Sequence, residues 1–580
     1  MNRSFAAIVM FVMFCVLSGL LAGCGDGKTR WFSQSNKTAG DTPVPPPAVE
    51  GTIAEFAYLD GGADLLIRGY GLVVGLGGNG SRECPEPVRR AIAEQMMRYR
   101  QQSGNGVSAD VSADRMIDDM DTGVVVISAA IPPGVPVGTK VDAYVQALPG
   151  TQTTSLDGGT LMTADMTQFD ARRAGTVESR AFGAAHGAIF VNPFADTTSP
   201  SVGQRLREGR IIGGCTTTES RAIRLILRQA DYGRAQMIQN RINERFDSIP
   251  KVASAKDPTY IDLRIPKAYR NDYKHFLQLI THLYLNKAGG MQDQKAMQLT
   301  KDILLPTAQH EDIALVWEAM GRQVAPMLRD LYKSDNVPAA YYAARAGSRL
   351  GDLTARDVLI QAARTSGSPY QFDAIAELST VRDLQAFGVL KELLDSNNEL
   401  VRVAAYEALC ACGYQGAVQR TNVDDQFTVD VVPSGRDFVI YATQTGTPRL
   451  VFFGQAVRVR QPVFFTSPDG ILTLHAEKSD KLLHAFRKVG AQKRLSEVFD
   501  IPFDVPSLVK TLGQIPTKGA DGKARGLGLT YSQVVGVLYR LCDEKDKTIP
   551  AKFVLQRTDE LKRILQGTSA VGRPDSAGTQ

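Results

Sequence analysis

The feature that most constrains the fold is a short apolar run interrupted by glycines, DLLIRGYGLVVGL, at residues 64–76. Its content of Leu, Ile and Val is typical of a β-strand. A glycine inside a strand usually marks a bulge or a place where another backbone comes close. We therefore expect a β surface that meets another protein backbone, with Gly69, Tyr70, Gly71 and Gly75 as its candidate interface residues.

Residues 75–80 also match the G-x-G-x-x-G pattern of dinucleotide-binding loops. In such a site the glycines bring backbone amides close to a pyrophosphate at the N-terminus of a helix. Here Pro85 and Pro87 separate the last glycine from the next helical segment, and QQSG at 101–104 stands where an acidic ribose ligand is expected. The context disfavours a nucleotide site, and we expect no cofactor.

Further blocks follow the glycine-rich run in a fixed order. They are VVVIS at 124–128, IPP at 131–133, VGTKVD at 137–142 and LDGGTL at 156–161. Together with the glycine-rich run, these blocks resemble the flagellar basal-body P-ring protein family, over about residues 52–290. The resemblance implies an α+β region that serves as a structural subunit of a ring around the flagellar rod, without catalytic residues.

The first residues have the layout of a lipoprotein signal peptide, 1–23. Arg3 precedes an apolar run, and the run ends in Leu-Ala-Gly directly before Cys24. We expect cleavage before Cys24 and acylation of its thiol, because two or more acyl chains hold a protein durably on a membrane. The alternative is an uncleaved transmembrane helix, which has no use for the Gly23-Cys24 pair.

The segment after the signal, 24–51, is a predicted Pro-rich tether between the lipid and the first folded domain. Its first residue after the cysteine is Gly25. Resemblance to bacterial lipoproteins, in which Asp at this position often means retention in the inner membrane, favours the outer membrane. We therefore expect a periplasmic protein anchored by Cys24.

Residues 291–420 have a helical pattern with a repeat. Ala343, Ala374 and Ala405 follow one another at intervals of 31 residues, and the last copy resembles a HEAT repeat. Small residues at a fixed spacing let paired helices approach and stack into a continuous core. The alternative is an ordinary helical domain with accidental alanine spacing.

The rest of the chain divides into a β-rich module at 421–480, short helices and loops at 481–567, and a disordered tail at 568–580. Strands are expected at 426–432, 437–443, 448–453 and 471–474, and an amphipathic helix at 530–541. The predicted fold class is therefore α+β and multidomain.

Charge and cysteine content exclude several classes of function. The chain has 66 basic and 61 acidic residues, a formal net charge of +5, which is too small for its length to imply a nucleic-acid partner. Seven cysteines are present. The five beyond Cys24 are an odd number at mostly wide spacing, and Cys410 and Cys412 lack the two-residue gap of a redox pair, so they give no disulfide framework and no zinc pattern. Whether Cys84 and Cys215 form a disulfide stays open.

The six histidines give no metal motif. His310-Glu311 begins like a zinc helix, but Ala314 stands where the second ligand should be. His275 and His282, seven residues apart, are expected to flank an apolar helix face. We expect no catalytic residue and no metal.

These observations predict a non-enzymatic structural lipoprotein of the cell envelope. Its expected partners are further copies of itself in a ring, or other rod and ring proteins of the flagellum, together with the membrane at Cys24. The alternative is an outer-membrane adaptor that binds another envelope protein through residues 291–420. A third hypothesis is an enzyme that uses the glycine-rich loop.

Overall fold

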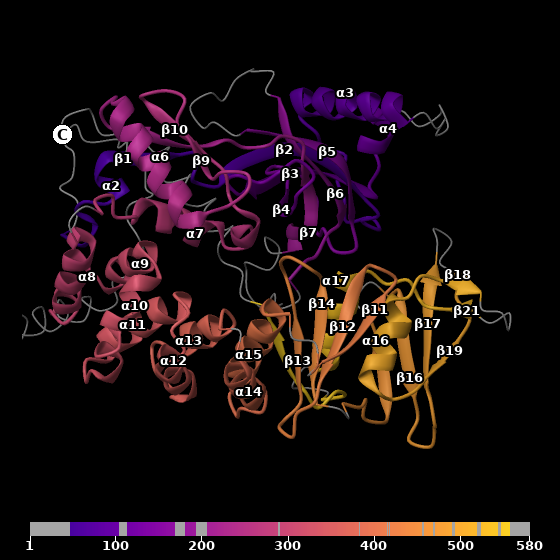
Figure 1. Cartoon of the computed structure of the whole chain (residues 1–580). Helices are drawn as coiled ribbons and strands as arrows, with labels where there is room; N and C mark the ends of the chain where they lie inside the picture. The colour runs from indigo at the N-terminus through magenta and orange to yellow at the C-terminus, as the bar shows by residue number, and fades with distance from the viewer. Residues whose placement is uncertain are drawn as a thin grey trace, which may run out of the picture. The chain divides into compact units, whose positions relative to one another are not determined.

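The computed structural model describes residues 47–103, 113–168, 180–192, 206–287, 290–381, 383–413, 416, 418–454, 457–467, 470–489, 494–518, 524–542 and 547–556. These residues belong to a compact unit, Pro46–Gln580. The signal peptide, Cys24 and the tail 568–580 lie outside the described residues. Within the described part of the chain, no helix combines the length and the apolar character that a membrane span requires. A purely helical stretch lies along the chain between two regions that combine sheets with helices (Figure 1), and the α+β multidomain class is confirmed.

The glycine-rich run forms one strand of a closed antiparallel barrel with the strand order β2-β3-β4-β7-β6-β5. The barrel interior is filled by Val, Ile, Leu, Ala and Met side chains, as the alternation of a small barrel requires. Its strands are β2 (Leu65–Val74), β3 (Thr122–Ile131), β4 (Lys140–Ala147), β5 (Thr160–Gln168), β6 (Ala181–Ala188) and β7 (Glu208–Thr217).

Two helices, α3 (Glu86–Ser103) and α4 (Ala113–Ile117), pack on the outside of β2 and β3. Ile92 and Ile117 meet Leu72 and Val124 there in a small apolar cluster. Because strand side chains alternate between faces, Leu72 points away from the barrel interior that its neighbour Val73 helps to fill.

A second, four-stranded sheet has the order β1-β8-β10-β9. Helices α6 and α7 contribute to its core. The Asp231 side chain caps α6 by accepting a hydrogen bond from the Arg234 amide at 3.1 Å. The elements are α2 (Ile53–Phe56), β1 (Ala57–Asp60), β8 (Ile223–Leu227), α6 (Tyr232–Phe246), β9 (Ala253–Ser254), β10 (Tyr260–Leu263) and α7 (Tyr273–Thr281).

The next region is helical, and its repeat has a structural counterpart. Ala343, Ala374 and Ala405 are completely buried, one each in α11, α13 and α15. α11 contacts α12, α12 contacts α13, and α13 contacts α15, so the helices are stacked as neighbours. The helices are α8 (Met291–Asp302), α9 (His310–Met320), α10 (Ala325–Leu328), α11 (Val337–Arg349), α12 (Ala355–Arg364), α13 (Gln371–Leu378), α14 (Leu384–Leu393) and α15 (Glu399–Ala411).

Arginine–carboxylate pairs recur along this stack. Arg349 pairs with Glu377, Arg356 with Asp383, and Arg364 with Glu392. The partners are 27 or 28 residues apart, so each pair joins one helical hairpin to the next. The classification as HEAT repeats stays a prediction.

The last region begins with a five-stranded sheet of order β11-β12-β14-β13-β22. The three expected strands between 426 and 453 are present within two residues of their predicted bounds, and β11 precedes them. The last strand, β22, pairs in parallel with β13. The strands are β11 (Gln419–Val423), β12 (Phe427–Val432), β13 (Val439–Ala442), β14 (Arg449–Phe453) and β22 (Lys552–Leu555).

A second sheet and two helices complete this region. Residues on both sides of position 480 share one hydrophobic core, and the predicted helix at 530–541 is α17, with Thr530 in a capping box. The stretch after 481 also holds strands where loops were expected. The elements are β15 (Val463–Thr466), β16 (Leu472–Ala476), β17 (Leu483–Val489), β18 (Arg494–Leu495), β19 (Phe499–Ile501), α16 (Val505–Gly513), β20 (Thr517–Lys518), β21 (Ala524–Arg525) and α17 (Tyr531–Leu541).

Candidate assembly surfaces

Two glycines of β2 face the interior of the barrel. A Cβ atom at Gly69 would lie 2.2 Å from the backbone oxygen of Asp165 in β5, and one at Gly71 would lie 2.8 Å from Ile127 and Leu161. The β2–β5 register shifts at this place. A glycine inside a strand often marks the place where another backbone comes close. At Gly69 that backbone is β5 of the same barrel.

Tyr70 lies on the opposite face of β2, and 40% of its surface is exposed. Gly75 has a φ of +81° at the end of the strand, a conformation that favours glycine. Of the four predicted interface residues, Tyr70 is therefore the one that offers a large side chain to a partner. The interface role of Gly69, Tyr70, Gly71 and Gly75 stays a prediction.

The loop after β2 uses its amides within the chain. The Gly77 N–H donates to the Asp121 carboxylate at 2.6 Å. The N–H groups of Leu76 and Gly80 donate to the backbone oxygens of Asp121 and Met120, each at 3.0 Å. A bound phosphate would have to displace these bonds and the Asp121 carboxylate, so this geometry disfavours a nucleotide site.

The thiols and histidines form no metal site among the residues that the structure describes, because no group of three or more His, Cys, Asp or Glu side chains could hold an ion there. Cys84 and Cys215 are free thiols. Burial raises the pKa of Cys215 to about 12, which keeps the thiol protonated and unreactive at neutral pH.

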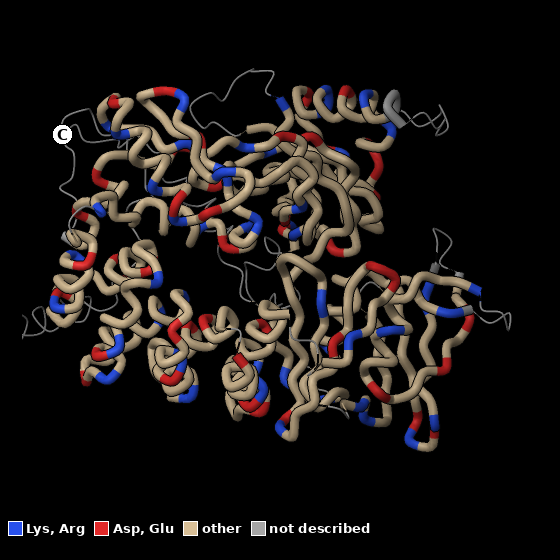
Figure 2. Tube along the Cα trace, in the orientation of Figure 1, with Lys and Arg blue, Asp and Glu red and all other residues tan. Residues whose placement is uncertain are grey.

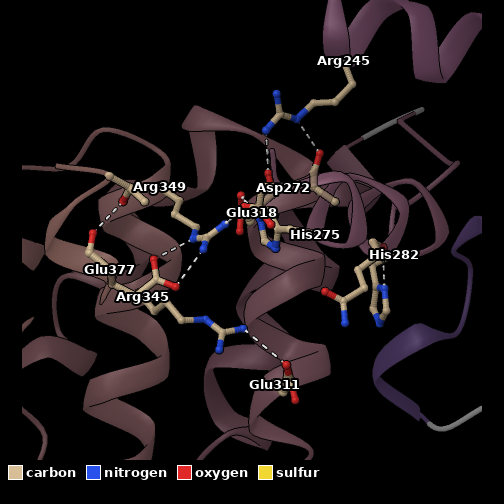
Figure 3. Close-up of polar contacts among 12 residues, drawn as sticks. Arg245, Asp272, His275, His282, Glu311, Glu318, Arg345, Arg349 and Glu377 are labelled. Atoms are coloured by element: carbon tan, nitrogen blue, oxygen red, sulfur yellow. Dashed lines mark hydrogen bonds and ion pairs between the residues drawn. The ribbon is translucent and has the colours of Figure 1, made fainter. Parts of the chain in front are cut away.

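A buried polar junction joins the second sheet's helices to the helical region (Figure 3). His275 in α7 and Glu318 in α9 lie 2.7 Å apart, between Nε2 and Oε1, and they are 8% and 6% exposed. Arg245 in α6 donates to the backbone oxygens of Glu318 and Ala319 at 2.8 and 2.9 Å. These carbonyls end α9, where a cation is favourable.

His282 makes a second contact between the same helices. Its Nε2 lies 3.2 Å from Asp312 in α9, and its Nδ1 lies 2.7 Å from the backbone oxygen of Gln278. Apolar packing accompanies both histidines, because Leu315 and Ala319 of α9 belong to the core around α7. The two histidines therefore flank a packed helix face, as the sequence predicts.

Arg349 extends the junction along the helical stack (Figure 3). Its guanidinium donates two hydrogen bonds to Glu377, each of 2.8 Å, and lies 3.6 Å from Asp272, the residue before α7. Burial opposes the charge of Arg349, but the bidentate bond to Glu377 outweighs it and raises the pKa of Arg349. The arginine thus links three helices.

A second buried network joins α15 to the five-stranded sheet. Asp430 in β12 has no exposed surface and accepts two hydrogen bonds from Arg420, at 2.9 and 2.7 Å. The Tyr406 hydroxyl of α15 donates to Asp430 at 2.5 Å, and Arg449 donates to Tyr406 at 3.0 Å. Burial raises the pKa of Tyr406, which keeps the hydroxyl a donor.

The barrel and the second sheet are the part of the chain that similar proteins share. Residues 52–292 match the family model of the flagellar P-ring protein. This P-ring-like region coincides with the span predicted from the sequence blocks, so the recognition of the family in the N-terminal half is confirmed.

Three flagellar P-ring proteins illustrate the likeness. The protein of Geobacter sulfurreducens is 28% identical over 244 residues, that of a Helicobacter pylori strain 27% over 242, and that of Thermotoga maritima 26% over 241. Each match covers 40% of this chain and 61%, 61% and 66% of the relative, respectively. The chain thus spans about 61% of the length of the first of these relatives.

The P-ring-like region also contacts the last region. The Val191 N–H donates to Ser532 Oγ of α17 at 3.2 Å, and the rings of Phe190 and Tyr531 stack 5.8 Å apart. Asp142 of the barrel accepts bonds from the Gly213 and Gly446 amides at 2.6 and 3.3 Å. The P-ring-like region thus contacts the last region as well as the helical region.

Sequence reasoning placed His275 and His282 beside an apolar helix face but missed the residues that pair with them and the whole Asp430 network. His275 and Glu318 are 43 residues apart, and Tyr406 and Asp430 are 24 apart, so no local motif connects them. A usable signal was a polar residue on an otherwise apolar helix face, as at Glu318 in IALVWEAM. A buried carboxylate is stable only with a hydrogen-bonding or basic partner. Glu318 therefore predicts such a residue on another element.

Proposed function

We propose that this protein is a non-enzymatic structural component of the flagellar basal body, held in the periplasm by a lipidated Cys24. The P-ring-like region, residues 52–292, carries the proposal, since it matches proteins named for the flagellar P-ring. In this role the region contacts further copies of the chain or other rod and ring proteins. The outer surface of the barrel then packs against a complementary surface of the neighbouring subunit.

Deletion and point variants test this role. Cells that carry a deletion of residues 52–290 are expected to swim poorly and to show altered rings in isolated basal bodies. A Tyr70→Ala chain is the finer test, because it removes a large side chain that is 40% exposed on the outer face of β2. Unchanged rings and unchanged swimming in the deletion strain would contradict the flagellar role.

The lipid anchor is tested separately at Cys24. We expect Cys24→Ser to release the protein from the membrane fraction into the soluble periplasm, because the variant cannot form a thioether to lipid. A Cys84→Ser chain is the matched control and is expected to stay membrane-bound. Retention of the Cys24→Ser protein in the outer-membrane fraction would contradict acylation as the anchor.

A second candidate function is an envelope adaptor that binds a partner through the helical region. Leu353, two residues before α12, and Leu384, the first residue of α14, are 31 residues apart and are 59% and 86% exposed. Equivalent exposed leucines on successive hairpins form a repeated apolar contact. Full-length chains with both leucines changed to Lys should lose a partner that the wild type and an Ala376→Lys control both capture.

A further inference from the structure

Helix α8 and the turn after it have one buried side and one side that exposes apolar residues. Met297, Leu304 and Leu305 are 55%, 45% and 52% exposed. The turn continues the helix, because the Leu304 and Leu305 amides each donate to the backbone oxygen three residues earlier, at 3.2 and 3.1 Å. The opposite side is completely buried in the core of the helical region and consists of Ala296, Leu299 and Ile303.

Charged residues of both signs occur along α8 (Figure 2), and their positions on the helix decide which side they reach. Met297, Lys301 and Leu304 follow one another at intervals of four and three residues, which places them on one side of a helix. Asp293 and Asp302, the carboxylates of α8, lie at the two margins of that side by helical geometry. The exposed side thus combines apolar side chains with one exposed lysine.

The described chain begins against the same core that the buried side of α8 fills. Its first element is the short 3₁₀ helix η2 (Pro47–Val49), and Ala48 belongs to that core. η2 contacts α9, which also contacts α8. The Leu285 amide, six residues before α8, donates to the Gly51 oxygen at 3.0 Å. The segment that follows Cys24 therefore enters the fold beside α8 (Figure 1).

This point of entry decides which partner the exposed side meets. Only 22 residues, 25–46, stand between Cys24 and Pro47. Once the lipid of Cys24 is in a bilayer, a second contact of the chain with that bilayer is intramolecular, and its effective concentration is about millimolar for a short linker. A face too small to hold a membrane by itself is then sufficient.

The lysine within this face also favours a bilayer over a protein partner. Cores of protein–protein interfaces are depleted in lysine. At a bilayer surface, by contrast, a lysine lays its aliphatic stem along the apolar layer and extends its ammonium group to the headgroups. Lys301 stands between Met297 and Leu304 in this way.

We propose that the exposed side of α8, formed by Met297, Lys301, Leu304 and Leu305, rests on the membrane surface that holds the lipid of Cys24. Its apolar side chains insert at the boundary between headgroups and acyl chains, and Lys301 meets the phosphates of the headgroups. The inference rests on the proposed acylation of Cys24 and not on the flagellar role. It turns the α8 end of the helical region toward the lipid.

Oxidation of methionine tests the proposal, because hydrogen peroxide converts an accessible thioether into a sulfoxide. The protein is the full mature chain with its lipid, inserted into vesicles of phosphatidylethanolamine and phosphatidylglycerol, and the reference is the Cys24→Ser chain free in buffer. We expect Met297 to oxidise several-fold more slowly on the vesicles. Met237 of α6, which is 54% exposed against 55% for Met297, is the matched control and should oxidise at the same rate in both.

A double variant, Leu304→Glu and Leu305→Glu, places carboxylates against anionic headgroups. It should stay on the vesicles through its lipid, while its Met297 oxidises as fast as in the free chain. The control variant, Val337→Glu and Phe372→Glu, makes the same change at positions of the helical region that are 62% and 45% exposed, and it should keep Met297 protected. Circular dichroism checks that both variants are folded.

Met297 that oxidises equally fast on the vesicles and in buffer would overturn this inference alone, because the lipid-bearing chain leaves the acylation standing. Protection that grows with the number of chains per vesicle would also overturn it, since a second copy would then cover α8. Protection that persists in the Leu304→Glu and Leu305→Glu variant would do the same. A purified chain without the mass of an acyl group would overturn the acylation, and this inference with it.

Discussion

His275 of α7 and Glu318 of α9 lie 2.7 Å apart in a site that leaves each less than a tenth exposed. The first belongs to the P-ring-like region and the second to the helical region. This polar contact joins α7 to α9 inside a hydrophobic core, although the two residues are 43 positions apart in the sequence. Removing either partner leaves the other buried without its match.

The first prediction concerns this pair. His275→Ala should lower the free energy of unfolding by about 3 kcal/mol, because Glu318 would stay buried without its partner. The measurement is urea unfolding followed by circular dichroism. Arg90→Ala, which breaks an exposed pair with Glu86, is the control and should cost about 0.5 kcal/mol or less. Equal losses of stability in the two variants would show that the His275–Glu318 contact contributes no more than an exposed ion pair.

The second prediction compares two residues of the α15 network. Tyr406→Phe removes the two hydrogen bonds of the hydroxyl, to Asp430 and from Arg449, and should cost about 1.5 kcal/mol. Asp430→Ala should cost more, about 3 kcal/mol, because it leaves the buried Tyr406 hydroxyl unsatisfied and removes the partner of Arg420. Thermal unfolding of both variants measures which one loses more stability. A larger loss of stability in Tyr406→Phe than in Asp430→Ala would contradict the prediction.

The third prediction concerns the glycines of β2. Gly69→Ala should destabilise the chain by roughly 1 to 3 kcal/mol, because the added Cβ would lie 2.2 Å from a backbone oxygen that cannot move freely. Tyr70→Ala should change the free energy of unfolding little, since the side chain is 40% exposed. An undiminished stability of Gly69→Ala would show that the barrel does not close as described.

The fourth prediction is a dependence on pH. Burial works against the charge of Asp383, but the Arg356 guanidinium and the α14 amides prevail and lower the pKa of this carboxyl from its usual 3.8. A lowered pKa in the folded state adds stability above the unfolded pKa, and that stability is lost as the pH falls through the folded value. Asp383→Asn should therefore be less stable than the wild type at neutral pH.

The difference in free energy of unfolding between Asp383→Asn and the wild type should shrink as the pH is lowered below 3.8. Chemical unfolding at a series of pH values measures it as a difference, so the carboxylates common to both chains cancel. Asp335→Asn removes one exposed charge and is the control, with a small gap at every pH. A gap at Asp383 that widened in acid would contradict the ion pair.

Local pattern predicted much of the secondary structure. The spacing of His275 and His282 indicated the helix that is α7, and the run at 426–432 indicated β12. The alanines at intervals of 31 residues indicated positions that are buried in α11, α13 and α15. In each case the signal is contained in a window of a few residues, which is the range over which helix and strand periodicity acts.

Long-range pairing could not be predicted in this way. The closure of β2 on β5 joins Val73 to Leu161, and the glycines that allow it seemed from the sequence to serve a partner. The Asp430 network and the His275–Glu318 pair likewise depend on which helices pack together. Periodicity shows that a face is buried, but it does not show which element covers it.

The place of β22 bears on how the chain matures. Lys552–Leu555 pairs with Val439–Ala442, more than a hundred residues earlier in the sequence, and without it β13 would be an uncovered strand at the margin of its sheet. A polypeptide that is synthesised from its N-terminus can finish this sheet only after residues 552–555 have emerged. Until then the open strand invites pairing with other chains, so a holding chaperone has its greatest value during that interval.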